Sequence, residues 1–147
     1  MIPLYKGGNP LRYAEKLLKE TGIKVTPQRS EILEILSNTR SHPGVENIYQ
    51  QVREKFPSVS LATVYKTVEL FVRRGIIQEL CITRDVSRYD ARVEPHPHVT
   101  CISCGKVEDV EGLPLENLIE SAERVTGYKI MKEETMYFGY CKDCRDN

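Results

Sequence analysis

The chain has 147 residues, of which 40% are apolar and 29% charged, and its formal net charge is zero. This length allows one domain or two small ones, and a polar chain without a long apolar run is not a membrane-spanning protein. The first eight residues are too short and too polar for a secretory leader. The five cysteines, an odd number, favour metal thiolates in a reducing cytoplasm over a secreted disulfide framework.

The zero net charge conceals two regions of opposite sign. Residues 1–90 carry 14 Lys and Arg against 10 Asp and Glu, a balance of +4, whereas residues 91–147 carry 7 against 11, a balance of −4. A basic first region is consistent with contact to a polyanion, although an ordinary solvated surface gives the same count.

Four amphipathic segments come first along the chain. Helix start signals, a capping residue followed by proline, occur at Asn9-Pro10 and Thr26-Pro27. A third helix is expected between Gly44 and Pro57. A fourth begins after Ser60, and its expected inner face consists of Leu61, Val64, Val68, Phe71 and Val72.

Two strand patterns follow the fourth helix, at Ile76–Ile82 and Ser87–Asp90, joined by a polar turn. Cys81, which has no nearby thiol, is expected to be a small buried side chain in the first strand. Several helices followed by a hairpin is the order of a winged helix, in which the last helix enters the major groove of DNA.

The fourth helix keeps an outer face that can meet thymine methyls, base edges and phosphates. Its residues are Ala62, Thr63, Tyr65 and Lys66. A helix that only packs against its neighbours is the plainer reading, and a winged helix that binds only protein is another.

The fold class predicted is α+β. It comprises an N-terminal winged-helix DNA-binding domain (1–90), a hinge (91–95), and a small α/β dimerisation domain with a zinc knuckle (96–147). The second domain is expected to contain strands at His96–Ile102, Lys106–Val110 and Tyr128–Tyr140, and a helix that includes Leu115, Leu118, Ile119, Ala122 and Val125. It is too small to bury a large core, so zinc and a partner subunit are the expected supplements.

Two Cys-x-x-Cys pairs, Cys101/Cys104 and Cys141/Cys144, are separated by the 36 residues from 105 to 140. Each pair on a tight turn supplies two corners of a tetrahedron, so four thiolates predict one structural zinc without a vacant position for substrate. A thioredoxin-type redox motif would need a helix after the cysteines, and these pairs lie among strands and turns.

Two of the three histidines alternate with prolines at His96 and His98. In a strand, positions i and i+2 point to the same side, so these imidazoles can hold two corners of a second ion. Asp90, Asp109 and the more distant His42 can complete a site. Each of these three residues also has a simpler explanation: His42 could begin a helix, and Asp90 or Asp109 could be a surface charge.

In the joint order of its motifs the chain resembles the ferric uptake regulator family of bacterial metal-dependent repressors. The matching stretches are Thr26-Pro27-Gln28-Arg29, His42-Pro43, Ser60-Leu61-Ala62-Thr63-Val64-Tyr65-Lys66-Thr67, Arg88-Tyr89-Asp90, His96-Pro97-His98, Cys101-Ile102-Ser103-Cys104-Gly105 and Tyr140-Cys141-Lys142-Asp143-Cys144. The resemblance implies a cytoplasmic homodimer on double-stranded operator DNA, with no membrane and no small-molecule substrate beyond metal ions and peroxide. We also assign Ser60 and Arg29 to the DNA interface.

The resemblance further implies structural Zn(2+) at the four cysteines and a regulatory Fe(2+) or Mn(2+) between the domains. The implied regulatory ligands are His42, Asp90, His96, His98 and Asp109. An aspartate at position 109 is typical of the peroxide-sensing branch, where iron-uptake regulators more often carry glutamate. Glu133 and Glu134 stand where many uptake regulators place a histidine of another metal site.

We therefore expect a repressor that senses peroxide when bound iron(II) promotes oxidation of His42 or His96. The alternatives are a regulator of iron, manganese or zinc uptake, and a zinc-thiol redox switch. A metal-dependent hydrolase or deaminase needs a general base beside the metal, and no His-x-Glu or His-Glu-x-x-His motif occurs. We expect no enzymatic activity.

Overall fold

A computed structural model describes residues 10–83, 86–113 and 116–146. The chain forms two compact units, residues 1–94 and residues 95–147. Among the described residues, no helix has the length and apolar character needed to cross a bilayer.

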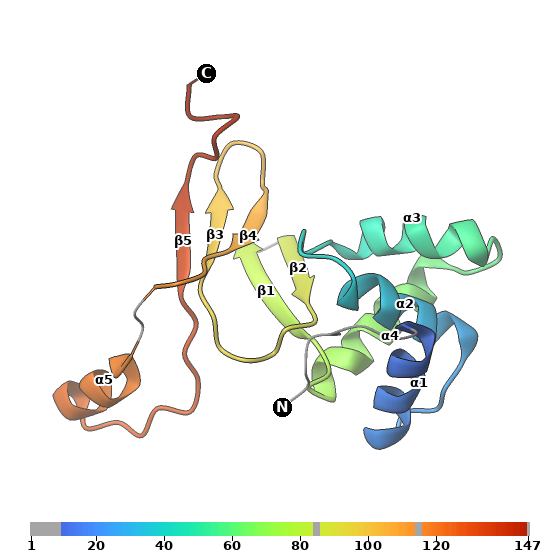
Figure 1. The fold of residues 1–147 in the computed structure, drawn as a ribbon, viewed down its shortest axis with the longest axis horizontal. Helices are drawn as coiled ribbons and strands as arrows, with labels where there is room; N and C mark the ends of the chain where they lie inside the picture. The colour runs from blue at the N-terminus through green and yellow to red at the C-terminus, as the bar shows by residue number, and fades with distance from the viewer. Residues whose placement is uncertain (1–9, 84–85, 114–115, 147) are drawn as a thin grey trace. The chain divides into compact units, whose positions relative to one another are not determined.

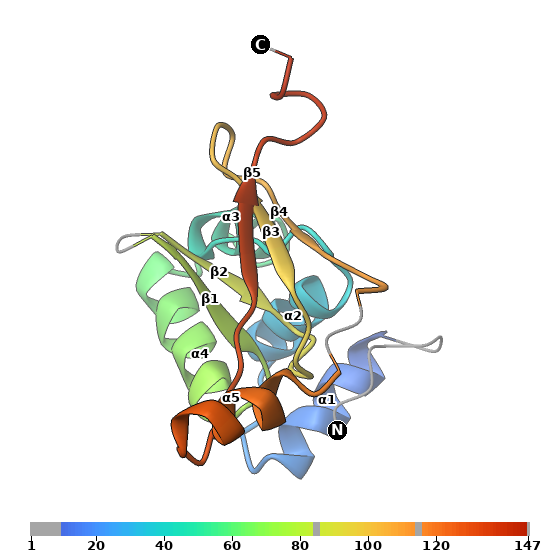
Figure 2. The same cartoon turned by 90° about the vertical axis from the view of Figure 1, so that its left-hand side faces the viewer.

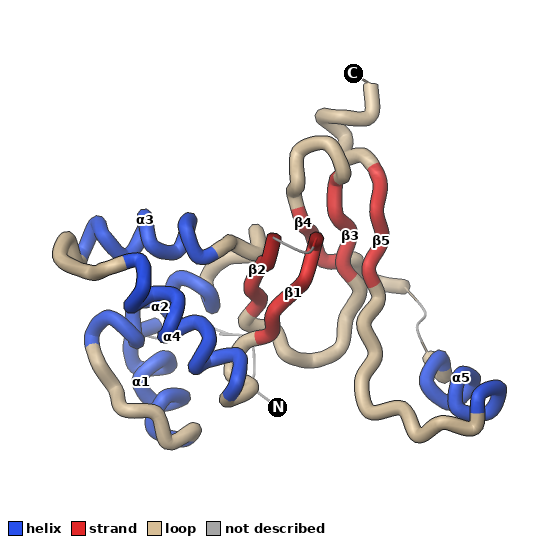
Figure 3. Tube along the Cα trace, turned by 180° about the vertical axis from the view of Figure 1, so that it is seen from behind, coloured by secondary structure: helices blue, strands red, loops and turns tan. Residues whose placement is uncertain are grey.

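Over its described residues, the first unit contains four helices and a hairpin (Figure 1). The helices are α1 (Pro10–Glu20), α2 (Pro27–Ser37), α3 (Val45–Lys55) and α4 (Leu61–Arg73), and the strands are β1 (Gln78–Thr83) and β2 (Val86–Asp90). Figure 3 shows this order of helices and strands along the chain. The helices share one apolar core, whose fully buried members include Leu18, Ile32, Ile48, Val64 and Phe71.

Local signals explain where two of these helices begin. The Thr26 hydroxyl accepts a hydrogen bond from the Arg29 backbone N–H at 3.3 Å, and proline follows at the first position of α2. The Ser60 hydroxyl accepts from the Thr63 N–H at 3.1 Å at the start of α4. The Asn9 cap expected for α1 lies outside the described residues.

Two burial predictions for this unit are wrong. Leu61, in the first turn of α4, is 37% exposed, and Thr67 takes a place on the buried face instead. Cys81 is exposed rather than buried. Side chains alternate between the two faces of a strand, and because Leu80 of β1 faces the protein interior, its neighbour Cys81 faces solvent.

The described part of the second unit contains a three-stranded sheet and one helix. Its elements are β3 (His98–Cys101), β4 (Val107–Asp109), α5 (Leu118–Thr126) and β5 (Met136–Gly139). Strand β3 lies in the middle of the sheet, antiparallel to β4 and parallel to β5 (Figure 2). Because parallel strands end at the same edge, the loops that follow β3 and β5 begin side by side.

The strand expected over Tyr128–Tyr140 is far shorter than predicted. Only Met136–Gly139 forms a strand, paired residue for residue with His98–Cys101. A strand is held by its ladder partner, and β3 supplies only four residues. Glu133 and Glu134 therefore precede the strand. Leu115 of the expected helix lies outside the described residues, and the helix itself begins at Leu118.

Apolar side chains remain exposed over much of this unit. Helix α5 has no buried residue, although Leu118, Ile119 and Val125 lie on it. Val125 is 86% exposed and Met131 is 83% exposed, and further large apolar side chains in the same state are Ile102, Leu113, Tyr128, Tyr137, Phe138 and Tyr140. Among the described buried apolar side chains, only Pro97, Cys101 and Val107 belong to residues 95–147.

Candidate metal centre and DNA-reading helix

The parallel pairing of β3 with β5 brings the two Cys-x-x-Cys turns together. Cys101 pairs with Gly139, and the Ile102 N–H donates to the Gly139 carbonyl at 2.8 Å, so both turns leave the same edge of the sheet. In each turn a backbone N–H returns to the first cysteine's carbonyl, from Gly105 at 2.9 Å and from Cys144 at 3.0 Å. In the structure, the four cysteines predicted as zinc ligands therefore lie close together.

The four sulfur atoms have the spacing that tetrahedral zinc requires. All lie within 4.8 Å of one another, and Cys104 Sγ is 3.8 Å from Cys141 Sγ. Zinc–sulfur bonds of about 2.3 Å at tetrahedral angles place sulfur atoms about 3.8 Å apart. The donor set therefore fits a closed zinc site, with every corner occupied by a thiolate.

The thiols differ in how readily they ionise. The Cys141 backbone N–H, which donates to Cys101 Sγ at 3.4 Å, is the main cause that lowers the pKa of the Cys101 thiol to about 6. The Ser103 hydroxyl lowers the pKa of Cys144, but the neighbouring thiols and desolvation outweigh it and raise that pKa to about 12. Without a cation, clustered thiols cannot all ionise, so metal binding must release protons.

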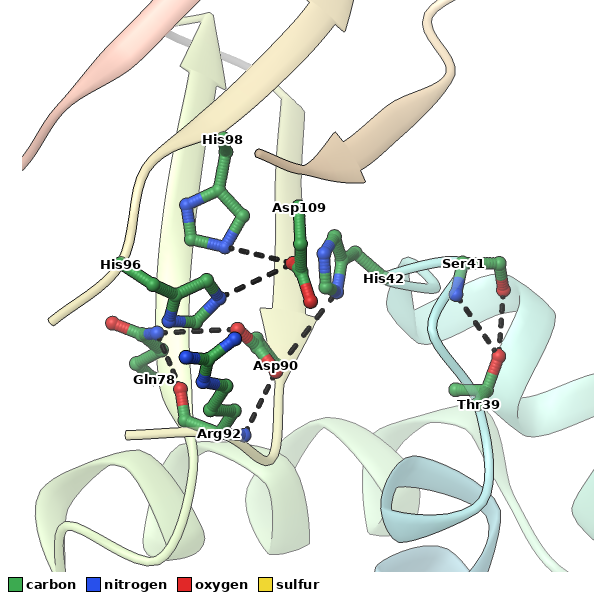
Figure 4. A network of polar contacts seen from close by, with 9 residues as sticks. All are labelled: Thr39, Ser41, His42, Gln78, Asp90, Arg92, His96, His98 and Asp109. Carbon is green, nitrogen blue, oxygen red and sulfur yellow. Dashed lines mark hydrogen bonds and ion pairs between the residues drawn. The ribbon is translucent and has the colours of Figure 1, made fainter. Parts of the chain in front are cut away.

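Three of the expected regulatory ligands meet within the second unit (Figure 4). His98 and Asp109 are direct cross-strand partners on β3 and β4. Asp109 Oδ1 lies 3.5 Å from His98 Nε2 and 3.2 Å from His96 Nε2. The two imidazole rings are 4.2 Å apart between centroids. Ligands bound at about 2.1 Å from one ion are separated by about 3.0–3.5 Å, so this group has suitable spacing.

The other two expected ligands lie in the first unit. His42 Nδ1 is 3.9 Å from Asp90 Oδ1 at the end of β2. The loop that carries His42 is tied to this strand, because the Tyr89 N–H donates to the Pro43 carbonyl at 3.1 Å. The His42 backbone has a φ of 47°, in the left-handed region that non-glycine residues seldom adopt. Local backbone strain of this kind often occurs at functional sites.

The start of α4 presents most of the residues predicted to contact DNA. Ala62, Tyr65 and Lys66 are exposed, and Thr63 is partly exposed. The Tyr65 hydroxyl donates to Glu46 Oε1 on α3 at 2.7 Å, and this bond raises the pKa of Tyr65 and lowers that of Glu46. The Ser60 hydroxyl is engaged in capping α4. Arg29, on α2, donates to the Lys24 carbonyl at 2.9 Å.

The model of the ferric uptake regulator family matches residues 20–138 of this sequence, most of its length. The chain belongs to the ferric uptake regulator family.

Two relatives in this family align with nearly the whole chain. The peroxide operon regulator of Bacillus subtilis is 38% identical over 134 residues, which cover 91% of this chain and 92% of the relative. The peroxide-responsive repressor PerR of Staphylococcus saprophyticus is 36% identical, covering 88% of this chain and 87% of the relative. Both relatives are named as regulators.

Solved structures of the family share the fold, which pairs a winged-helix DNA-binding domain with a dimerisation domain. The Helicobacter pylori ferric uptake regulator aligns with a TM-score of 0.80 at 25% identity, covering 97% of this chain and 99% of that chain. The Campylobacter jejuni peroxide stress regulator aligns with a TM-score of 0.71 at 28% identity, covering 93% and 100% respectively.

Sequence reasoning missed two residues beside these groups. Glu46 holds Tyr65, and Gln78 contacts Asp90 through its side-chain amide. The only signal for Gln78 was the expected hairpin, which was predicted to begin at Ile76. In the structure Gln78 and Asp90 are the first and last residues of the hairpin and pair across its strands.

Proposed function

We propose that this protein is a cytoplasmic, homodimeric repressor that binds operator DNA when its regulatory metal site is occupied and releases it after peroxide oxidises a metal ligand. The observation that carries this proposal is the convergence of His96 and His98 on Asp109 Oδ1 in the second unit. The relatives named as peroxide regulators support the same reading. The protein acts as a regulator and not as an enzyme.

The regulatory donor set combines imidazoles with carboxylates. Such ligands suit iron(II) and manganese(II), and also accept zinc(II). The proposed set is completed by His42 and Asp90 from the first unit. A cation that takes ligands from both units favours whichever arrangement of the units offers it more of them.

This choice of arrangement controls DNA binding. A dimer reads two half-sites in successive major grooves about 34–36 Å apart, so the two copies of α4 must be held at a fixed separation. The exposed apolar side chains of residues 95–147 support dimerisation through this unit, because a monomer would leave them in water. The four-cysteine zinc stabilises the same unit and takes no part in sensing.

The sensing step is the loss of one ligand. An iron(II) ion held by His42, His96 and the other ligands would supply the electron that starts cleavage of the O–O bond of hydrogen peroxide. In the net reaction one peroxide oxygen would be inserted into a C–H bond of an imidazole, and the other would leave as water. Addition of oxygen to either His42 or His96 would remove the ability of that imidazole to ligate. The remaining ligands then no longer hold the two units in the DNA-binding arrangement.

Treating the iron-loaded protein with one equivalent of hydrogen peroxide should add one oxygen atom to His42 or His96. Peptide mass spectrometry locates the added mass, and operator affinity is measured on the same sample. The manganese-loaded protein is the control and should gain no oxygen, because manganese(II) holds the ligands without this reactivity. Release of DNA by peroxide with both histidines unmodified would contradict the proposal.

Changing Lys66 to alanine should weaken binding to operator and to random DNA by a similar factor. We expect Lys66 to contact a phosphate, so its loss should also reduce the slope of log affinity against log salt by about one unit. Fluorescence anisotropy at several salt concentrations measures both effects. Lys16 on α1 pairs with Glu20, and the matched Lys16→Ala variant should leave the slope unchanged.

A regulator of metal uptake is the second candidate, favoured by the TM-score of 0.80 with a ferric uptake regulator. Such a regulator would bind DNA when its metal is abundant and would stay bound after treatment with peroxide. A zinc-thiol switch would instead release its zinc before it releases DNA. Operator titrations with iron, manganese and zinc, each with and without peroxide and with zinc release followed in parallel, separate the three.

A further inference from the structure

Gln78 makes two hydrogen bonds that converge on the region around Asp90 (Figure 4). Its side-chain Nε2 lies 3.2 Å from Asp90 Oδ2 and 2.6 Å from the Arg92 carbonyl oxygen. Both neighbours are acceptors, so both amide hydrogens of Gln78 are donated. Gln78 is the first residue of β1 and pairs directly with Asp90, the last residue of β2.

The second oxygen of the same carboxylate is also held. The Arg92 backbone N–H donates to Asp90 Oδ1 at 2.8 Å. A carboxylate oxygen can accept more than one contact, so a hydrogen bond to each oxygen is compatible with binding of a cation by the same carboxylate. With Oδ1 fixed by the backbone and Oδ2 fixed by Gln78, the plane of the carboxylate cannot rotate without breaking a bond.

We propose that Gln78 is a positioning residue for the regulatory metal, which sets the orientation of the Asp90 carboxylate and hence the affinity of the site. This inference rests on the proposed function, because it requires Asp90 to be a ligand. Side chains that orient a ligand typically change metal affinity 10–100-fold when removed. The bond from Gln78 to the Arg92 carbonyl adds a second effect, since it fixes the chain two residues after the ligand to β1.

A purely structural role in the hairpin is the competing possibility. Another hydrogen bond joins the same two strands without touching Asp90, from the Ser87 hydroxyl to Glu79 Oε1 at 2.5 Å. Removing it provides a matched control for loss of one interstrand contact. Glu79 and Ser87 both belong to the hairpin formed by β1 and β2.

The experiment measures the affinity of the zinc-loaded protein for manganese(II). Free manganese(II) is quantified by its electron paramagnetic resonance signal. The variants are Gln78→Met, which keeps the length of the side chain but has no donor, Ser87→Ala, Asp90→Asn and the Gln78→Met/Asp90→Asn double variant. We expect about tenfold weaker binding in Gln78→Met and unchanged binding in Ser87→Ala. The double variant should be no weaker than Asp90→Asn alone, because Gln78 acts through Asp90.

Thermal unfolding of the manganese-free proteins completes the test, and Gln78→Met, which loses one hydrogen bond more than Ser87→Ala, should unfold at most a few degrees below it. If Asp90→Asn weakens manganese binding but Gln78→Met does not, or if the two losses add in the double variant, the inference about Gln78 is overturned while the proposed function stands. If Asp90→Asn binds manganese like the unmodified protein, the ligand assignment in the proposed function fails first. The two failures are therefore distinguishable.

Discussion

Replacing Cys141 with serine should remove zinc from the protein and unfold residues 95–147. The reason lies in how little else holds this unit together, since Pro97, Cys101 and Val107 are its only buried apolar side chains among the described residues. Structural zinc contributes on the order of 10–16 kcal/mol in small zinc-dependent folds, which is comparable to the whole stability of a typical domain, about 5–15 kcal/mol. Zinc content by elemental analysis and circular dichroism measure the two effects.

Cys81 offers the matched control for that experiment. It is an exposed thiol in the first unit and is not a member of the four-cysteine cluster. Cys81→Ser should retain one zinc per chain and the spectrum of the unmodified protein. A Cys141→Ser protein that kept both its zinc and its resistance to proteolysis within residues 95–147 would show that the four thiols are not the structural site.

Removing one imidazole from either unit should abolish manganese-dependent operator binding. The two variants are His42→Gly and His98→Ala. Glycine is chosen at position 42 because the backbone φ of 47° suits it, so the ligand is lost without added strain. Removing a residue that only contacts a metal ligand weakens metal binding by up to roughly 100-fold. Loss of a direct ligand should weaken manganese binding by more than this. Anisotropy titrations of labelled operator with manganese measure the loss.

The comparison of the two variants tests whether one ion takes ligands from both units. Equal loss in both is expected, whereas an effect of His98→Ala alone would place the ion within the second unit and remove the proposed coupling. Glu108 provides the control, because it neighbours Asp109 but pairs with Lys106 at 3.0 Å. Glu108→Ala should bind operator like the unmodified protein.

The predictions that succeeded rest on strong local chemistry. Thr26 and Ser60 cap their helices as expected, because the short range of a capping bond makes it visible in sequence. The four cysteines gather as predicted, since two closely spaced pairs of thiols suit the corners of one tetrahedral ion. The meeting of His96 and His98 with Asp109 needed the register of β3 against β4, which their alternation only partly predicts.

The failures concern contacts that sequence does not encode locally. The length of β5 is limited by its partner β3, which no pattern within Tyr128–Tyr140 specifies. The outward direction of Cys81 follows from the phase of the strand, which a single cysteine does not define. Gln78 is an ordinary polar residue until its pairing with Asp90 is known, so a residue that only orients a ligand leaves no motif.

The uncovered apolar side chains of residues 95–147 link folding to the amount of protein present. In the proposed homodimer, these side chains leave water only when a second copy arrives, so the melting temperature should rise with chain concentration. A cell that makes little of this regulator would then lose it to proteolysis as well as to dilution. Its steady-state level would respond more than proportionally to its rate of synthesis.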